Sequence, residues 1–133
     1  GSIGFSFPAA MGAWAATRDI EALKGRPVVS VSGDGGFGQY LAEFTTAVKY
    51  GMKITHILLN NSQLGKISKE QRAAELEVWQ TSWQNPDFSE YAKLCGGHGR
   101  RVENADDLSP AISEALAYDG PALVEIISDP DLI

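Results

Sequence analysis

A cluster of glycines between two apolar runs constrains most strongly what this chain of 133 residues can fold into. The β-branched run at 27–31 indicates a buried strand, and the run at 54–59 indicates a second one. Between them stands Gly33-Asp34-Gly35-Gly36-Phe37-Gly38, followed by apolar residues at helical spacing up to Gly51. The unit is strand, glycine turn, helix, strand, and it places Asp34 and Asn61 where parallel strands end, at the edge that binds ligands in open sheets.

Two chemistries fit this unit. The spacing Gly33-x-Gly35-x-x-Gly38 after a strand matches a dinucleotide-binding fingerprint. That fingerprint also needs an acidic residue about 20 positions further on, to hold a ribose hydroxyl. The second predicted strand ends instead in Asn60-Asn61, with no carboxylate nearby. The dinucleotide interpretation therefore lacks one of its parts.

A metal–diphosphate site is the better interpretation. Asp34 supplies an anionic oxygen and Asn61 a neutral one, while the amides of Gly35 and Gly36 carry no side chain and a phosphate can approach them. Magnesium takes one or two protein carboxylates and completes its octahedron with substrate phosphates and water. One aspartate, one asparagine and a diphosphate make such a set.

Gly33-Asp34-Gly35 followed by Asn60-Asn61 at the next strand end resembles the thiamine-diphosphate motif. The resemblance is to the C-terminal, diphosphate-binding domain of the enzymes that include pyruvate oxidase, acetolactate synthase and pyruvate decarboxylase. It implies thiamine diphosphate and Mg²⁺ as cofactors. It also implies three metal ligands, which are Asp34, Asn61 and the main-chain carbonyl of Gln63. The residues that the resemblance places around the cofactor are Gly1, Ile3, Gly33, Asp34, Gly35, Gly36, Asn61, Gln63, Leu64 and Gly65, with the main chain of Gly1 and Ile3 at the aminopyrimidine ring.

Within the family, Ile67-x-x-Glu70-Gln71 is similar to a pattern in pyruvate oxidase, where the glutamate lies near the reacting carbon. Glu70 is therefore the candidate catalytic residue; the alternative is an exposed helical carboxylate beside Lys66. Lys66 departs from the oxidase pattern, in which an aromatic residue is usual, so the electron acceptor and the second substrate stay open. The resemblance implies a pyruvate oxidase-like enzyme that decarboxylates a 2-oxo acid such as pyruvate, with an acetolactate synthase-like carboligase as the alternative. FAD, if used, would bind in a domain outside this chain.

The composition of the chain argues against several classes of partner and location. Eleven Lys and Arg against seventeen Asp and Glu give a net charge of −6, which argues against nucleic acid or an anionic membrane as a partner. No apolar run approaches the roughly 18 residues of a membrane span. The single Cys95 excludes an internal disulfide and suits a reducing compartment, so we expect a cytoplasmic protein.

Alternating strands and helices predict an α/β fold, with three layers (α/β/α), a mostly parallel sheet and right-handed crossovers. We expect residues 1–133 to form one thiamine-diphosphate and Mg²⁺ binding domain, the C-terminal part of a longer enzyme that is a homodimer or homotetramer. The family carries its activating glutamate on a separate domain of a neighbouring subunit. The isolated chain is therefore expected to be inactive, and a cofactor-binding module or subunit without activity of its own is the alternative. Trp79 and Trp83 are expected to be buried rather than stacked on a ligand.

Overall fold

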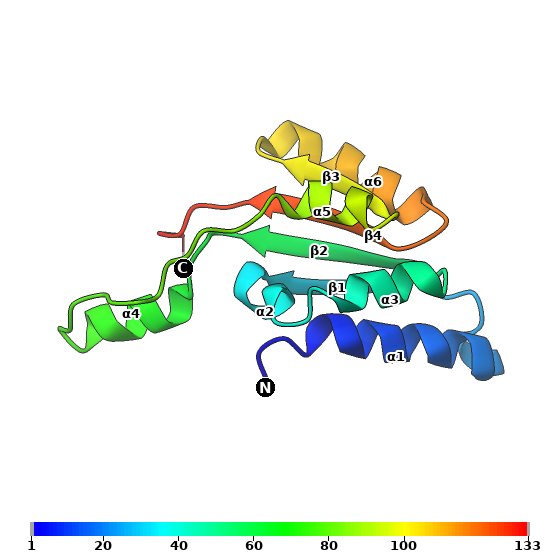
Figure 1. Cartoon of the computed structure of the whole chain (residues 1–133), viewed down its shortest axis with the longest axis horizontal. Helices are drawn as coiled ribbons and strands as arrows, with labels where there is room; N and C mark the ends of the chain where they lie inside the picture. Colours follow the sequence, from blue (N-terminus) through cyan, green and yellow to red (C-terminus); the bar gives the residue numbers. More distant parts are fainter. Residues whose placement is uncertain (1, 133) are drawn as a thin grey trace.

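A parallel sheet forms the centre of the molecule in the computed structural model, which describes residues 2–132. Its strands are β1 (Val28–Gly33), β2 (Ile54–Asn60), β3 (His98–Val102) and β4 (Ala122–Ile127). They lie in the order β1-β2-β4-β3, and each neighbouring pair is parallel (Figure 1). Their carboxyl ends therefore share one edge of the sheet, as predicted for the glycine unit.

Helices cover both faces of this sheet. The helices are α1 (Ser6–Asp19), α2 (Asp34–Gly38), α3 (Glu43–Lys49), α4 (Gly65–Ala73), α5 (Phe88–Leu94) and α6 (Leu108–Ala117), with short 3₁₀ turns at Glu21–Leu23 and Ala105–Asp107. Helices α1, α2, α3 and α5 pack into one core and α6 into another, while α4 projects beyond the end of the sheet (Figure 1). The predicted three-layer α/β/α fold is confirmed.

Four phenylalanines fill the larger core, one from each of the helices on that face. Phe7, Phe37, Phe44 and Phe88 are all at most 1% exposed. Phe7 touches two of the others, with ring centroids 5.5 Å from Phe37 and 5.8 Å from Phe44. Burying each such side chain contributes roughly 1.5–3 kcal/mol to the stability of the fold. The packing of Phe37 against the other rings therefore fixes the position of α2.

A helix follows the glycines, as predicted, but the glycine stretch, expected as a turn, is itself helical. The glycine stretch itself forms the short helix α2, the chain turns, and α3 begins at Glu43. Three glycines in five residues give α2 little intrinsic helical preference, and Phe37 holds it by packing into the core. Gly51 follows α3 with φ of +59°, as expected for a residue that ends a helix.

Helix α5 lies directly against the edge strand β3. A Cβ atom on Gly99 of that strand would overlap the main-chain carbonyl of Ser89 in the helix. Asp87 starts α5 by accepting a hydrogen bond from the Glu90 N–H at 2.8 Å. The helix and the strand are thus in backbone contact, with no side chain between them.

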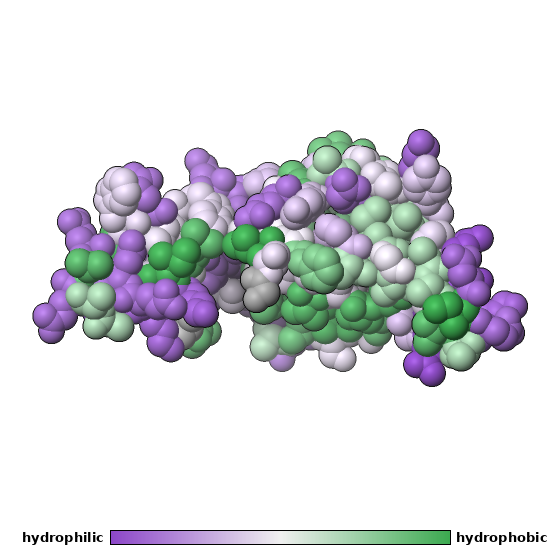
Figure 2. Space-filling view, turned by 90° about the horizontal axis from the view of Figure 1, so that it is seen from below, coloured by the Kyte–Doolittle hydropathy of each residue, from purple (hydrophilic) through white to green (hydrophobic). Residues whose placement is uncertain are grey.

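Apolar residues gather over the middle of the face seen in Figure 2, and most of the strongly hydrophilic residues lie toward its two ends. Exposed apolar side chains of the N-terminal segment and of β1 include Ile3, Phe5, Val29 and Val31. In the part of the chain that the structure describes, no helix combines the length and the apolar character that crossing a bilayer requires.

Candidate functional site

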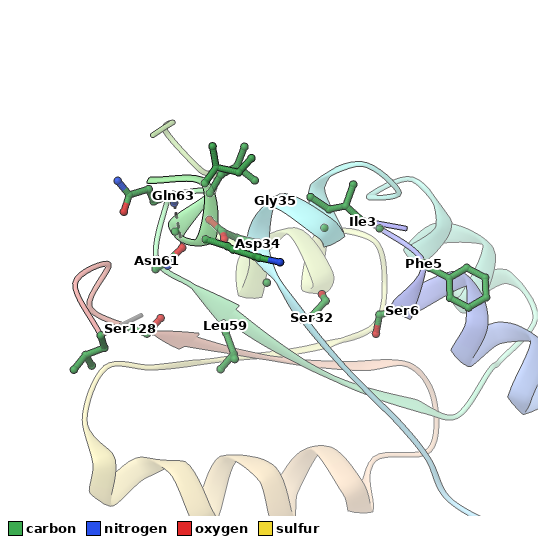
Figure 3. A pocket seen from close by; sticks show the side chains of 18 of the residues that line it. Ile3, Phe5, Ser6, Ser32, Asp34, Gly35, Leu59, Asn61, Gln63 and Ser128 are labelled. Atoms are coloured by element: carbon green, nitrogen blue, oxygen red, sulfur yellow. Dashed lines mark hydrogen bonds between the residues drawn. The ribbon is translucent and has the colours of Figure 1, made fainter. Parts of the chain in front are cut away.

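A pocket of about 740 Å³ opens at the carboxyl edge of the sheet. It lies between the N-terminal segment, the glycine turn, the loop after β2 and the segment after β4 (Figure 3). Its volume falls within the range of small-molecule and cofactor sites. The lining residues are Ser2, Ile3, Gly4, Phe5, Ser6, Ser32, Gly33, Asp34, Gly35, Gly36, Leu59, Asn61, Gln63, Leu64, Gly65, Lys66, Ile67, Ser128, Asp129 and Leu132.

The structure brings the predicted cofactor residues together in this pocket. The predicted residues that line it are Ile3, Gly33, Asp34, Gly35, Gly36, Asn61, Gln63, Leu64 and Gly65. Gly1 lies outside the described residues. In Figure 3, Asp34, Asn61 and Gln63 lie on one side of the pocket, and Ile3 lies across from them beside Gly35.

Asp34 is the first residue of α2 and is only 3% exposed. Its Oδ2 atom accepts a hydrogen bond from Trp83 Nε1 at 3.2 Å and another from Asn85 Nδ2 at 2.5 Å. These are the hydrogen bonds that the Asp34 side chain receives from residues 2–132, and both fall on the same oxygen. The carboxylate is therefore held through Oδ2, and Oδ1 keeps its lone pairs.

Trp83 and Asn85 come from the loop at 74–87, and the sequence did not single out either as a site residue. The Trp83 ring lies over the glycine turn, because a Cβ on Gly35 would come within 2.7 Å of it. This close approach explains glycine at position 35. The expectation of burial is wrong for Trp79, which is 68% exposed, while Trp83 is half-buried. No helix spans the two tryptophans.

The loop after β2 is fixed by its own hydrogen bonds. Asn61 Oδ1 accepts a hydrogen bond from the Gln63 N–H at 3.1 Å, which leaves that oxygen a second lone pair. Gln63 pairs with Ser82 in an isolated antiparallel bridge. Its Oε1 atom is buried and has no hydrogen-bond partner among the described residues. The bridge ties the loop that carries two predicted metal ligands to the loop that carries Trp83.

A buried polar chain runs from Asn85 into the sheet. Asn85 Nδ2 also donates to Asn60 Oδ1 at 2.8 Å, and Asn60 Nδ2 donates to Glu125 Oε1 at 2.7 Å. Asn60 is 5% exposed and Glu125 is fully buried. Arg101 balances the Glu125 charge with an N···O distance of 3.3 Å. The pKa of Arg101 is raised above its ordinary value by its hydrogen bond to Glu103, and the charge of Glu125 adds to this.

A second buried group, His56, lies on β2 beneath the glycine turn. Its Nδ1 is 2.7 Å from Ser30 Oγ and its Nε2 is 3.1 Å from Ser32 Oγ, and its ring stacks on Phe37 with centroids 4.7 Å apart. Burial lowers the pKa of His56 from 6.5 to about 3, so the imidazole is neutral at neutral pH. The sequence offered one sign of this buried group, because His56 interrupts an apolar strand. The structure adds that Ser30 lies opposite it in the parallel register.

Glu70 does not line the pocket. Its side chain is 67% exposed and its carboxylate lies 4.0 Å from the Lys66 ammonium, one helical turn away. This position matches the alternative weighed from the sequence, an exposed helical carboxylate beside Lys66. Lys66 and Ile67, at the start of α4, do line the pocket.

The oxygen atoms of the predicted metal ligands suit a hard cation whose remaining coordination positions are filled by a bound diphosphate. Within residues 2–132 there is no group of three or more His, Cys, Asp or Glu side chains that could hold a metal ion. Asp34, Asn61 and Gln63 offer only oxygen donors, with a single carboxylate among them. Magnesium accepts such a set when phosphate oxygens complete its shell. The residues present therefore fit Mg²⁺ together with a diphosphate.

Fold and site define a cofactor-binding domain of the α/β class. Residues 1–126 match the family described as thiamine pyrophosphate enzyme, C-terminal TPP binding domain, and the chain belongs to that family. It is 40% identical over 102 residues to YdaP of Bacillus subtilis, named as a thiamine pyrophosphate-containing protein, an alignment that covers 77% of this chain and 18% of YdaP. It is 35% identical over 130 residues to the mitochondrial acetolactate synthase catalytic subunit of Aspergillus candidus, covering 97% of this chain and 18% of that protein.

A solved structure agrees with these matches. The thiamine diphosphate-dependent 4-hydroxybenzoylformate decarboxylase of Rhodococcus jostii superposes with a TM-score of 0.83 and 30% identity, covering 96% of this chain and 23% of that one. The chain thus spans about a fifth of the length of the curated relatives above, 18% of each. Family membership decides between the two interpretations of the glycine turn, in favour of thiamine diphosphate over a dinucleotide.

Proposed function

We propose that this chain binds the diphosphate of thiamine diphosphate through Mg²⁺, as part of an enzyme that decarboxylates a 2-oxo acid such as pyruvate. The single observation that carries the proposal is the pocket itself. It gathers Asp34, Asn61 and Gln63 at the carboxyl edge of the sheet, in a chain of the thiamine pyrophosphate enzyme family.

Each residue has a distinct part in this proposal. Asp34 gives the ion its only protein carboxylate, through the oxygen that Trp83 and Asn85 leave unused. Asn61 and the main-chain carbonyl of Gln63 add neutral oxygens. When bound, the cofactor supplies the carbanion stabilisation needed to break the bond beside the carbonyl of a 2-oxo acid. The chain anchors and orients the cofactor, and the apolar Ile3, which lines the pocket, helps to exclude water from it.

The substrate class rests on a relative and on the family pattern. The Rhodococcus jostii relative is named for decarboxylating 4-hydroxybenzoylformate, which is a 2-oxo acid. The pattern Ile67-x-x-Glu70-Gln71 favours a pyruvate oxidase-like enzyme, with FAD on a domain outside these residues and a homodimer or homotetramer as the assembly. The acetolactate synthase relative favours the second candidate, an acetolactate synthase-like carboligase. The catalytic role of Glu70 stays a prediction.

Calorimetric titration with thiamine diphosphate tests the proposal. We expect tight binding with Mg²⁺ and at least about 100-fold weaker binding with excess chelator. Removing the ion itself should cost more affinity than the roughly 10–100-fold that is lost when an outer-shell partner of a metal ligand is removed. Asp34→Ala should weaken binding as chelation does. Asp106→Ala, at an exposed aspartate outside the pocket, is the matched control and should bind like the wild type. Equal binding with and without the metal would refute the metal bridge.

A further inference from the structure

We propose that Asn85, together with Trp83, is a positioning residue of the cofactor site, which orients the Asp34 carboxylate for the metal ion. The inference rests on the proposed function, because it needs Asp34 as a metal ligand. Neither residue lines the pocket, so neither would touch the ion itself, and the inference concerns their contact with Asp34.

The contacts of Asn85 use both hydrogens of its amide. Asn85 Nδ2 lies 2.5 Å from Asp34 Oδ2 and 2.8 Å from Asn60 Oδ1. A primary amide nitrogen has two hydrogens to donate, so these two acceptors take both. The hydroxyl of Ser62, at 3.4 Å, is the most distant of the three neighbouring acceptors. The amide therefore points its nitrogen, and not its oxygen, at the carboxylate.

Two donors on one oxygen fix the direction of the other oxygen. The terminal torsion of an aspartate is broad, so an unanchored carboxylate rotates readily. With Asn85 and Trp83 both donating to Oδ2, rotation would break two hydrogen bonds at a residue that is 3% exposed. Losing hydrogen bonds to a buried charge is costly. Oδ1 is thereby held in one place before any ion arrives.

The orientation of Asn85 is itself determined by the sheet. Glu125 is fully buried and accepts from Asn60 Nδ2 at 2.7 Å, so the Asn60 amide must turn its oxygen toward Asn85. A flipped Asn85 would set its own oxygen against the oxygens of Asp34 and Asn60. Pro86 also restricts the Asn85 backbone to extended conformations. The chain Glu125–Asn60–Asn85–Asp34 thus has one consistent arrangement of donors and acceptors.

The test is a Mg²⁺ titration of purified protein at saturating thiamine diphosphate, with thermal unfolding of each cofactor-free protein measured alongside. Asn85→Ala should raise the apparent Kd for Mg²⁺ about 10–100-fold, the usual effect of removing an outer-shell partner of a metal ligand. Asn85→Asp keeps the shape of the side chain but places an oxygen against Asp34, so it should weaken Mg²⁺ binding at least as much. The control is Gln84→Ala, at the exposed neighbouring residue, and it should match the wild type.

The outcomes separate the two proposals. Wild-type Mg²⁺ affinity in both Asn85 variants would overturn the positioning role, while the proposed function would stand. Metal-independent binding by the wild type, or wild-type behaviour of Asp34→Ala, would instead refute the proposed function. If the Asn85 variants show no cooperative unfolding, Trp83→Phe decides, because it removes the Nε1 donor and keeps an aromatic side chain at position 83. Unchanged Mg²⁺ affinity in that variant would then overturn the inference.

Discussion

The buried imidazole of His56 should make the stability of this domain depend on pH in a specific window. Its pKa is about 3 in the folded chain, against 6.5 for an ordinary histidine. As the pH falls below 6.5 the unfolded chain therefore takes up a proton that the folded chain does not. The unfolded state then binds more protons, so the free energy of unfolding decreases as the pH falls from about 6.5 to about 3.

The size of the effect follows from the two pKa values. Each pH unit within the window costs about 1.4 kcal/mol of stability. Between pH 7 and pH 5, His56 should remove about 2 kcal/mol, and by pH 3 the loss reaches roughly 4 kcal/mol. For a domain whose total stability is about 5–15 kcal/mol, the first of these losses is already easy to measure.

Urea unfolding at pH 7 and pH 5, for the wild type and for His56→Gln, measures this loss. Glutamine retains an amide that can bond to Ser30 or Ser32 but does not titrate. The variant is expected to be less stable at pH 7, because it disturbs the packing on Phe37. Its further loss on going to pH 5 should be smaller than that of the wild type by about 2 kcal/mol, since all other titrating groups are common to both proteins. Equal losses in the two proteins would refute the assignment of the pH dependence to His56.

Two further predictions concern the glycine turn and the activity of the chain. Gly35→Ala should destabilise the protein by about 1–3 kcal/mol and weaken cofactor binding, because its Cβ would come 2.7 Å from the Trp83 ring. Gly38→Ala, whose Cβ meets nothing within 4 Å, is the control; urea unfolding and calorimetry compare them, and equal effects would contradict the reasoning. The 133-residue chain alone should not accelerate proton–deuterium exchange at C2 of the cofactor, because no carboxylate of the pocket among residues 2–132 is free for this task. Glu70 lies outside the pocket, Asp34 holds the metal in the proposed site, and Asp129 is exposed and accepts a hydrogen bond from the Asp131 N–H. NMR follows the exchange, and a rate above that of free cofactor would show that the chain holds its own activating acid.

The parts of the fold and site that local sequence determines were predictable. Apolar runs located β1 and β2 to within two residues, and the glycine motif located the pocket edge. The start of the helix after the glycines was misjudged, because apolar spacing alone does not show that Phe37 packs into the core and that the chain turns before Glu43.

The support of the site could not be predicted from local patterns. Asn85 and Trp83 lie about 50 residues from Asp34 in sequence, with hydrogen bonds of separation 51 and 49, and no spacing rule joins such distant positions. Glu125 is a charged residue in an otherwise apolar strand, and only its contacts with Asn60 and Arg101 explain its burial. These contacts arise only when parallel strands and a long loop meet in three dimensions.

The backbone contact between α5 and β3 means that a residue outside the pocket, Gly99, can affect cofactor binding. Any side chain at position 99 must push Ser89 away. Ser89 lies in the first turn of α5, four positions after Asn85. A survey of variants that fail to hold the cofactor would therefore include position 99, on an edge strand that contributes nothing to the pocket lining.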